Sequence, residues 1–154
     1  MKKVLIINIR SGSAARKTAT LFERYFLRET GIKVKYSSLL KGAHGKPLPI
    51  ANWYFNVSHS GQYWAMALSD EGEVGVDIER RRDMRPQMAR RILMRDEDAL
   101  EGELLRSWVL KEAYVKMLGD GLRLGFRSFS TSEVLKKYTV IDYSTEQYYC
   151  YVVC

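Results

Sequence analysis

The chain has 154 residues, enough for one compact domain or for two small fused lobes. A hydrophobic fraction of 46% argues against disorder, and no apolar stretch reaches the length of a membrane-spanning helix. The formal net charge of +7 favours an anionic partner, such as nucleic acid, a phosphate-rich ligand, a membrane surface or an acidic protein, but it also fits a basic surface that is merely soluble.

The first half of the chain predicts one helix among several strands. Ser13 can cap a helix over residues 14–29, and Gly31 can end it in the left-handed conformation. The sequence "KGAHGKPLP" is typical of a loop because glycine and proline interrupt it. Apolar, β-branched or aromatic runs predict strands over residues 3–9, 33–36, 54–58, 63–69 and 74–79.

The second half begins with a polar, arginine-rich stretch. It predicts short helices over residues 84–94 and 96–100, followed by a longer helix over residues 103–118 that Gly119 ends. Closing strands are predicted over residues 126–131, 138–143 and 148–153.

Each half of the chain combines strands with helices, so we expect an α+β sandwich of two similar lobes in one domain. The lobes would span about residues 1–72 and 73–154. Cys150 and Cys154 lie in a strand-like tail, where residues four apart are separated by about 13 Å. That distance is too long for a disulfide. Because no signal-peptide pattern is present either, we expect a cytoplasmic protein.

The sequence "EVGVDIERRR" places acids inside a strand-like run and arginines directly after it. Asp77 and Glu79 are two residues apart, so they point to the same face of a strand and raise each other's pKa. A hard divalent cation such as Mg²⁺ would relieve this repulsion. Alternatively, Arg81 is the neighbour on the same face and would neutralise the acids. Taken alone, this pair of acids favours the ion pair with arginine.

The predicted helix "SWVLKEAYVKMLGDG" contains a polar stripe. Trp108, Glu112 and Lys116 recur every four residues and therefore share one side of the helix. The simplest interpretation of Glu112 and Lys116 is an ordinary exposed ion pair, which is worth only about 0.3–0.5 kcal/mol. Glu112 would have a functional role if the site needs a third carboxylate beside Asp77 and Glu79.

A third segment, "GKPLP…WYFNVSHSG", collects groups that suit a phosphate. Lys46 lies between glycine and proline, and Asn56, Ser58 and His59 cluster at the end of a strand. A nucleophilic serine is the competing interpretation, but no G-x-S-x-G elbow surrounds Ser58. The chain has only two histidines and neither H-E-x-x-H nor C-x-x-C, which argues against a zinc site.

These segments together resemble one family. "GKPLP", "FNVSHSG", "GVDIE" and "WVLKEAYVKMLGDGL" occur in the order and approximate spacing of the 4'-phosphopantetheinyl transferase superfamily, over about residues 45–130. They are most similar to its surfactin-synthetase-activating subtype. The resemblance implies two α/β lobes related by a pseudo-twofold axis. It also implies transfer of the phosphopantetheine arm of coenzyme A to a carrier-protein serine, with release of adenosine 3',5'-bisphosphate and a need for Mg²⁺ or Mn²⁺.

The resemblance also implies roles for individual residues. The metal ligands would be Asp77, Glu79 and Glu112. Glu112 would in addition be the base for the incoming serine, directly or through water, and Lys116 would stabilise or protonate the leaving phosphate. The coenzyme A phosphates would be held by Lys46, Ser58, His59, Lys111 and Arg16, the last in "AARKTATLF".

The N-terminal lobe is shorter than the family pattern, while both lobes lie in one chain. We therefore expect a site inside a monomer. The net charge of +7 suits an acidic acyl or peptidyl carrier protein, whereas no nucleic-acid motif is present and the basic residues are spread along the chain. The alternative is a relative that binds coenzyme A or the carrier with weak catalysis or none.

Overall fold

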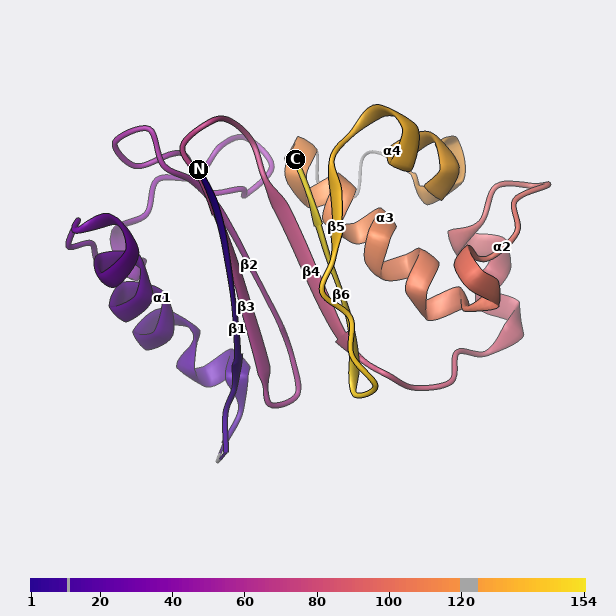
Figure 1. Cartoon of the computed structure of the whole chain (residues 1–154), viewed down its shortest axis with the longest axis horizontal. Coiled ribbons are helices and arrows are strands. Elements are labelled where there is room, and N and C mark those ends of the chain that lie inside the picture. Colours follow the sequence, from indigo (N-terminus) through magenta and orange to yellow (C-terminus); the bar gives the residue numbers. More distant parts are fainter. Residues whose placement is uncertain (11, 120–124) are drawn as a thin grey trace.

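Two three-stranded sheets lie face to face between two helices in the computed structural model, which describes residues 1–10, 12–119 and 125–154 (Figure 1). The strand orders are β1–β3–β2 and β4–β6–β5, with every pairing antiparallel. The strands are β1 (Lys2–Asn8), β2 (Tyr54–Ser60), β3 (Tyr63–Ser69), β4 (Gly75–Arg80), β5 (Val140–Asp142) and β6 (Tyr148–Val153). The helices are α1 (Ala14–Thr30), α2 (Ala89–Ile92), α3 (Leu104–Leu118) and α4 (Thr131–Lys137). The predicted α+β class is confirmed.

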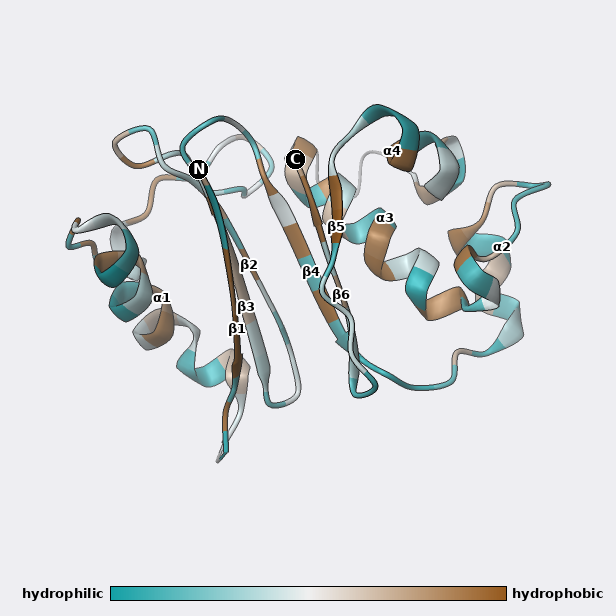
Figure 2. Cartoon of the chain, in the orientation of Figure 1, coloured by the Kyte–Doolittle hydropathy of each residue, from teal (hydrophilic) through white to brown (hydrophobic). Residues whose placement is uncertain are grey.

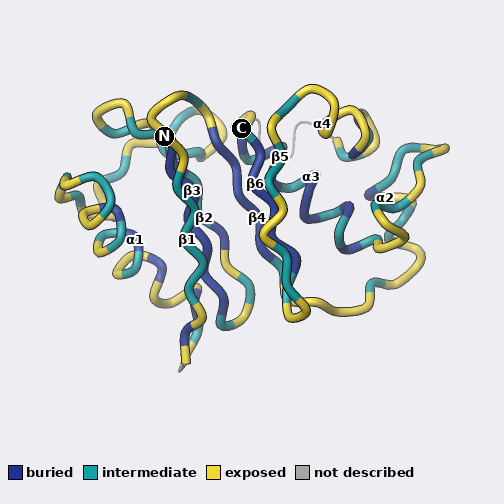
Figure 3. Tube along the Cα trace, in the orientation of Figure 1, coloured by how far each residue is buried: buried dark blue, intermediate teal, exposed yellow. Residues whose placement is uncertain are grey.

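The layers are held by apolar contacts on both faces of β3. Trp64, Met66 and Leu68 point toward α1, while Ala65 and Ala67 point toward the second sheet. This follows from the alternation of side chains along a strand. Small alanines on the inner face leave room for the apolar residues of the second sheet. Hydrophobic residues accordingly follow β1, β4 and β6 (Figure 2), and the buried residues concentrate at the centre of the molecule (Figure 3).

Three predicted elements are wrong. Residues 33–36 form no strand, and a 3₁₀ turn, Tyr36–Ser38, follows them. The predicted helix over residues 96–100 is irregular until the 3₁₀ turn Leu100–Gly102. The predicted strand over residues 126–131 is instead a 3₁₀ turn, Phe126–Ser128, leading into α4.

The start of α4 has a clear physical cause. Ser130 accepts a hydrogen bond from the Glu133 backbone N–H, and the Glu133 side chain accepts one from the Ser130 N–H. This reciprocal capping box stabilises a helix start more strongly than the neighbouring apolar residues favour a strand. The predicted helix over residues 84–94 is present in a shorter form, as the 3₁₀ turn Pro86–Met88 and α2.

Among the residues that the structure describes, none of the helices combines the length and hydropathy that crossing a bilayer requires. The end of the "WVLKEAYVKMLGDGL" motif, residues 120–122, lies outside the described residues.

Candidate functional site

Strand β4 lies at an edge of the second sheet, and side chains from β2 satisfy its outward backbone N–H groups. Every second residue of β2 points at this edge because side chains alternate along a strand. The backbone nitrogen of Val76 donates to Asn56 Oδ1 at 2.9 Å. In the same way, Ile78 N donates to Ser58 Oγ at 3.2 Å, and Arg80 N donates to Ser60 Oγ at 3.0 Å. We call these three contacts the β2–β4 ladder. The ladder joins the two lobes beside the candidate site.

Helix α3 approaches β4 most closely at Gly75. A Cβ atom there would lie 2.0 Å from the carbonyl oxygen of Ala113 and 2.4 Å from the backbone nitrogen of Met117. Only glycine permits such an approach of two backbones. Since Glu112 and Lys116 are on the same helix, this packing carries them to the strand that bears the acidic pair.

Asp77 is the most deeply buried acid of the site, with 5% of its surface exposed. Its Oδ1 accepts hydrogen bonds from Ser58 Oγ at 3.0 Å and from Lys116 Nζ at 2.6 Å. Its Oδ2 is buried and has no hydrogen-bond partner among the residues that the structure describes. Burial raises the pKa of Asp77, and Lys116 opposes that rise.

Glu79 and Glu112 face the same region of negative charge. Glu79 Oε2 accepts a hydrogen bond from Ser60 Oγ at 3.1 Å, and burial followed by repulsion from Asp77 raises the pKa of Glu79. Burial, again followed by repulsion from Asp77, raises the pKa of Glu112 to about 6. A carboxyl group with a pKa near neutrality is suited to accept and release a proton.

The three carboxylates fit a hard divalent cation chemically, although Lys116 supplies the cation beside Asp77 here. Among the described parts of the chain, no three acidic, histidine or cysteine side chains already meet in a metal-binding arrangement. The fit rests on the buried Oδ2 of Asp77, which has no hydrogen-bond partner among the described residues, and on the burial and repulsion from Asp77 that raise the pKa values of Glu79 and Glu112. Oxygen ligands of this kind are those that Mg²⁺ prefers.

The alternative ion pair between Arg81 and the acids, which the acidic pair favoured when taken alone, does not form. The guanidinium of Arg81 lies 4.3 Å from the centre of the Tyr149 ring instead. Over the described residues, Asp77 forms its ion pair with Lys116, and Glu79 forms none. The positive charge of Arg82 opposes the rise in the pKa of Glu79 through space.

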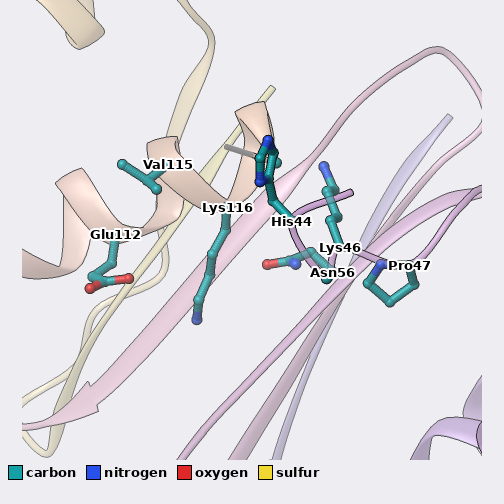
Figure 4. A pocket seen from close by; sticks show the side chains of 9 residues that line it. His44, Lys46, Pro47, Asn56, Glu112, Val115 and Lys116 are labelled. Carbon is teal, nitrogen blue, oxygen red and sulfur yellow. The ribbon is translucent and has the colours of Figure 1, made fainter. Parts of the chain in front are cut away.

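A cleft of about 250 Å³ opens beside this cluster. Figure 4 shows Glu112 and Lys116 projecting from α3, with Asn56 of β2 and the loop of His44 and Lys46 on the other side. The Lys46 ammonium donates to the Met117 carbonyl oxygen at 2.7 Å and pairs with the Glu73 carboxylate. The cleft therefore combines basic side chains with the half-buried Glu112 carboxylate.

Lys111 does not reach the cleft, so its predicted contact with phosphate needs correction. Its side chain is 0% exposed, and its ammonium lies 2.6 Å from the Glu97 carboxylate. It also donates to the carbonyl oxygens of Ile92, Phe126 and Phe129. Burial lowers the pKa of Lys111, and Glu97 opposes this. Lys111 is a buried cation that points from α3 into the core.

The other predicted phosphate ligands occupy different surroundings. Ser58 is buried and its hydroxyl is bound to Asp77. His59 and Arg16 are exposed, on β2 and in the first turn of α1. The sequence prediction overlooked Ser60, although its spacing of two from Ser58 places it on the same strand face.

Comparison with known proteins gives one family. A model of the 4'-phosphopantetheinyl transferase superfamily matches residues 73–153. The chain is 33% identical over 98 residues to "4'-phosphopantetheinyl transferase psf-1" of Bacillus pumilus, covering 56% of this chain and 42% of that protein. It is 34% identical over 100 residues to "4'-phosphopantetheinyl transferase Sfp" of Bacillus subtilis (strain 168), covering 56% and 43%.

A third relative matches a similar share of both chains. "4'-phosphopantetheinyl transferase AcpT" of Salmonella typhi is 42% identical over 94 residues, covering 53% of this chain and 49% of that protein. The chain therefore spans about half the length of these curated relatives.

Proposed function

The chain belongs to the 4'-phosphopantetheinyl transferase superfamily, and from this membership we propose that it transfers the phosphopantetheine arm of coenzyme A to a serine of an apo carrier protein. The observation that carries the proposal is Glu112. Its carboxylate stands at the cleft with a pKa raised to about 6, beside Lys116 and within repelling distance of Asp77 and Glu79. This arrangement combines a base, a cation and acidic ligands, which the transfer reaction needs.

The reaction exchanges one phosphorus–oxygen bond for another. The serine oxygen attacks the phosphorus that carries the pantetheine arm, and the bond from that phosphorus to adenosine 3',5'-bisphosphate breaks. The serine proton passes to Glu112, directly or through water. Lys116 stands next to the cluster and stabilises the charge on the leaving phosphate.

Asp77, Glu79 and Glu112 would hold Mg²⁺ or Mn²⁺, which when bound supplies positive charge to the diphosphate. Lys46 would exchange the Glu73 carboxylate for a phosphate of coenzyme A, since this residue lines the cleft and its ion pair with Glu73 is at the surface. His59 and Arg16 are exposed and would extend this basic surface. Ser58 would act through Asp77, because its hydroxyl hydrogen is donated there.

The partners follow from charge and from the placement of the site. A net charge of +7 would draw an acidic acyl or peptidyl carrier protein toward the cleft. The cleft and the acids are built from residues of both lobes of one chain, so we propose that the protein acts as a monomer.

The test is a mass measurement. Several apo carrier proteins are incubated with coenzyme A, Mg²⁺ and the full chain, and the carriers should gain the mass of one phosphopantetheine arm. Asp77→Ala and Glu112→Ala should abolish the gain, whereas the exposed acid variant Glu146→Gln should retain it. Binding of coenzyme A without a gain on any carrier would favour the alternative, a relative that binds without catalysis.

A further inference from the structure

Two of the three contacts of the β2–β4 ladder, which we call its rungs, also involve a carboxylate. The Ser58 hydroxyl accepts from the N–H of Ile78 and donates to the carboxylate of the preceding residue, Asp77. The Ser60 hydroxyl accepts from the N–H of Arg80 and donates to the carboxylate of the preceding residue, Glu79. The same local arrangement is therefore used twice, two residues apart.

The third rung explains why the arrangement stops there. Asn56 accepts from the N–H of Val76, but the residue preceding Val76 is Gly75, which has no side chain. At this contact the Asn56 side chain therefore meets the backbone N–H of β4 with no neighbouring carboxylate to hold. The hydroxyls at Ser58 and Ser60 are each both acceptor and donor, which matches the rungs where a carboxylate must also be held.

Glu79 depends on Ser60 more than Asp77 depends on Ser58. Asp77 Oδ1 is held by a second donor, Lys116 Nζ at 2.6 Å. For Glu79, Ser60 is the hydrogen-bond donor found among the described residues, at 3.1 Å. Glu79 is also only half-buried, so packing restricts its rotamers less than those of Asp77.

We propose that Ser60 is a positioning residue that orients the Glu79 carboxylate beside Asp77 for binding a divalent cation. Ser60 touches neither the cation nor a substrate. It fixes a carboxylate that does, and it fixes that carboxylate to the backbone of β4 across the boundary between the lobes. This inference rests on one part of the proposed function, the binding of a divalent cation by the acids.

The experiment measures Mn²⁺ binding to the full chain without coenzyme A or carrier, by the electron paramagnetic resonance signal of free Mn²⁺. Ser60→Ala should weaken Mn²⁺ affinity by about tenfold, the lower end of what loss of a ligand-orienting hydrogen bond costs. Ser60→Thr keeps the hydroxyl and should restore affinity. In thermal unfolding, a given Mn²⁺ concentration should raise the Tm of Ser60→Ala less than it raises the Tm of the wild type.

The matched control is Ser69→Ala. Ser69 is buried in β3, and its hydroxyl accepts a hydrogen bond from the backbone N–H of Glu71 at 3.1 Å. It should lose stability as Ser60→Ala does while keeping Mn²⁺ affinity. If Ser60→Ala does not fold, Ser60→Cys takes its place, because a thiol keeps the volume and is a weak donor.

Four results would overturn the proposal, three of them in the variants and one in the wild type. The first is an unchanged Mn²⁺ affinity in the alanine or cysteine variant of Ser60. The second is an equal loss of Mn²⁺ affinity in Ser60→Ala and Ser69→Ala. The third is failure of Ser60→Thr to restore Mn²⁺ binding. A wild-type protein that binds no Mn²⁺ would also overturn it. If Mn²⁺ binding depends on Ser60 but no carrier is modified, the inference stands and the proposed function falls.

Discussion

Residues 75–79, "GVDIE", each perform a separate physical task. Gly75 admits the backbone of α3, with which a Cβ atom would collide at 2.0 Å. Val76 and Ile78 are fully buried between the two sheets. Asp77 and Glu79 point to the opposite face, where Ser58 and Ser60 hold them. The alternation of a single strand thus builds both the inter-sheet core and the acidic site.

Replacing Gly75 by alanine should destabilise the protein by about 3 kcal/mol or more, because the added methyl group meets backbone atoms that cannot rotate away. Urea unfolding measures the loss. The matched control is Gly125→Ala, since a Cβ placed there meets no atom within 4 Å among the described residues beyond its own chain neighbours. Equal stability of the two variants would show that α3 can move away from β4.

Glu112→Gln should stabilise the protein above pH 6 and leave it nearly unchanged at pH 4. The folded chain keeps a proton on Glu112 up to a pKa of about 6, whereas the unfolded chain releases it near 4.5. The folded state thus binds more protons in this window, so the free energy of unfolding falls as pH rises through it. Because Glu112 is half-buried, the gain should be about 1 kcal/mol. A variant less stable than wild type at pH 8 would contradict this.

The activity of the same variant should change in the opposite direction. If Glu112 is the base, the wild-type transfer rate rises as pH rises through about 6, when the carboxyl group loses its proton. Glu112→Gln should lower kcat by about 10²–10⁴-fold, the usual contribution of a general base. The control Glu146→Gln should keep both the rate and its pH profile. A wild-type rate that is flat between pH 5 and pH 7 would exclude this role.

At the scale of elements, α3 is buried on more than one side. Glu112 and Lys116 face the cleft, while Lys111 points into the core and holds three backbone carbonyl groups and Glu97. Glu97 also accepts from the N–H of Thr131 at the start of α4. A single buried ion pair therefore connects α3 to the irregular segments on both sides of it.

Lys111→Met should cost about 3 kcal/mol or more, because it leaves the Glu97 carboxylate, 6% exposed, without its cation. The double variant Lys111→Met with Glu97→Gln should recover part of that loss, which a double-mutant cycle in urea measures. Full stability of Lys111→Met together with weaker coenzyme A binding would instead support the phosphate contact expected from the sequence.

Sequence periodicity predicted the elements whose pattern is unambiguous. These include β2, β3, β4, β6 and α3, and also the shared face of Asp77 and Glu79. It failed at residues 126–131, where a local capping box decided the structure. The resemblance implied a phosphate contact for Lys111, but a residue adjacent to a polar stripe can face either the cleft or the core, and only tertiary packing decides. The partner of Ser60 was equally hidden, since it lies on a strand that is not hydrogen-bonded to β2 by its backbone.

At the scale of the molecule, the lobes share a core. Ala65 and Ala67 of the first lobe pack with Val76, Ile78 and Val152 of the second. Separating the lobes would expose these residues to water at a cost of roughly 25 cal/mol for each Å² of apolar surface. We therefore propose that residues 1–154 form a single domain.

The full chain should unfold in one cooperative transition. Trp53 and Trp64 pack in the core of the first lobe, and Trp108 packs against the core of the second. Fluorescence of Trp108→Phe reports the first lobe, and fluorescence of a variant with Trp53→Phe and Trp64→Phe reports the second. Within each variant, the urea midpoint from fluorescence should coincide with that from circular dichroism. Separate transitions would show that the lobes fold independently.

The β2–β4 ladder has a further consequence for behaviour in concentrated solution. The open side of a terminal strand is a template onto which strands of other chains can add, and such addition leads to aggregates. Here the N–H groups of Val76, Ile78 and Arg80 already donate to side chains of the same chain. An incoming strand would find these donors occupied. We therefore expect Asn56, Ser58 and Ser60 also to protect the protein against self-association through β4.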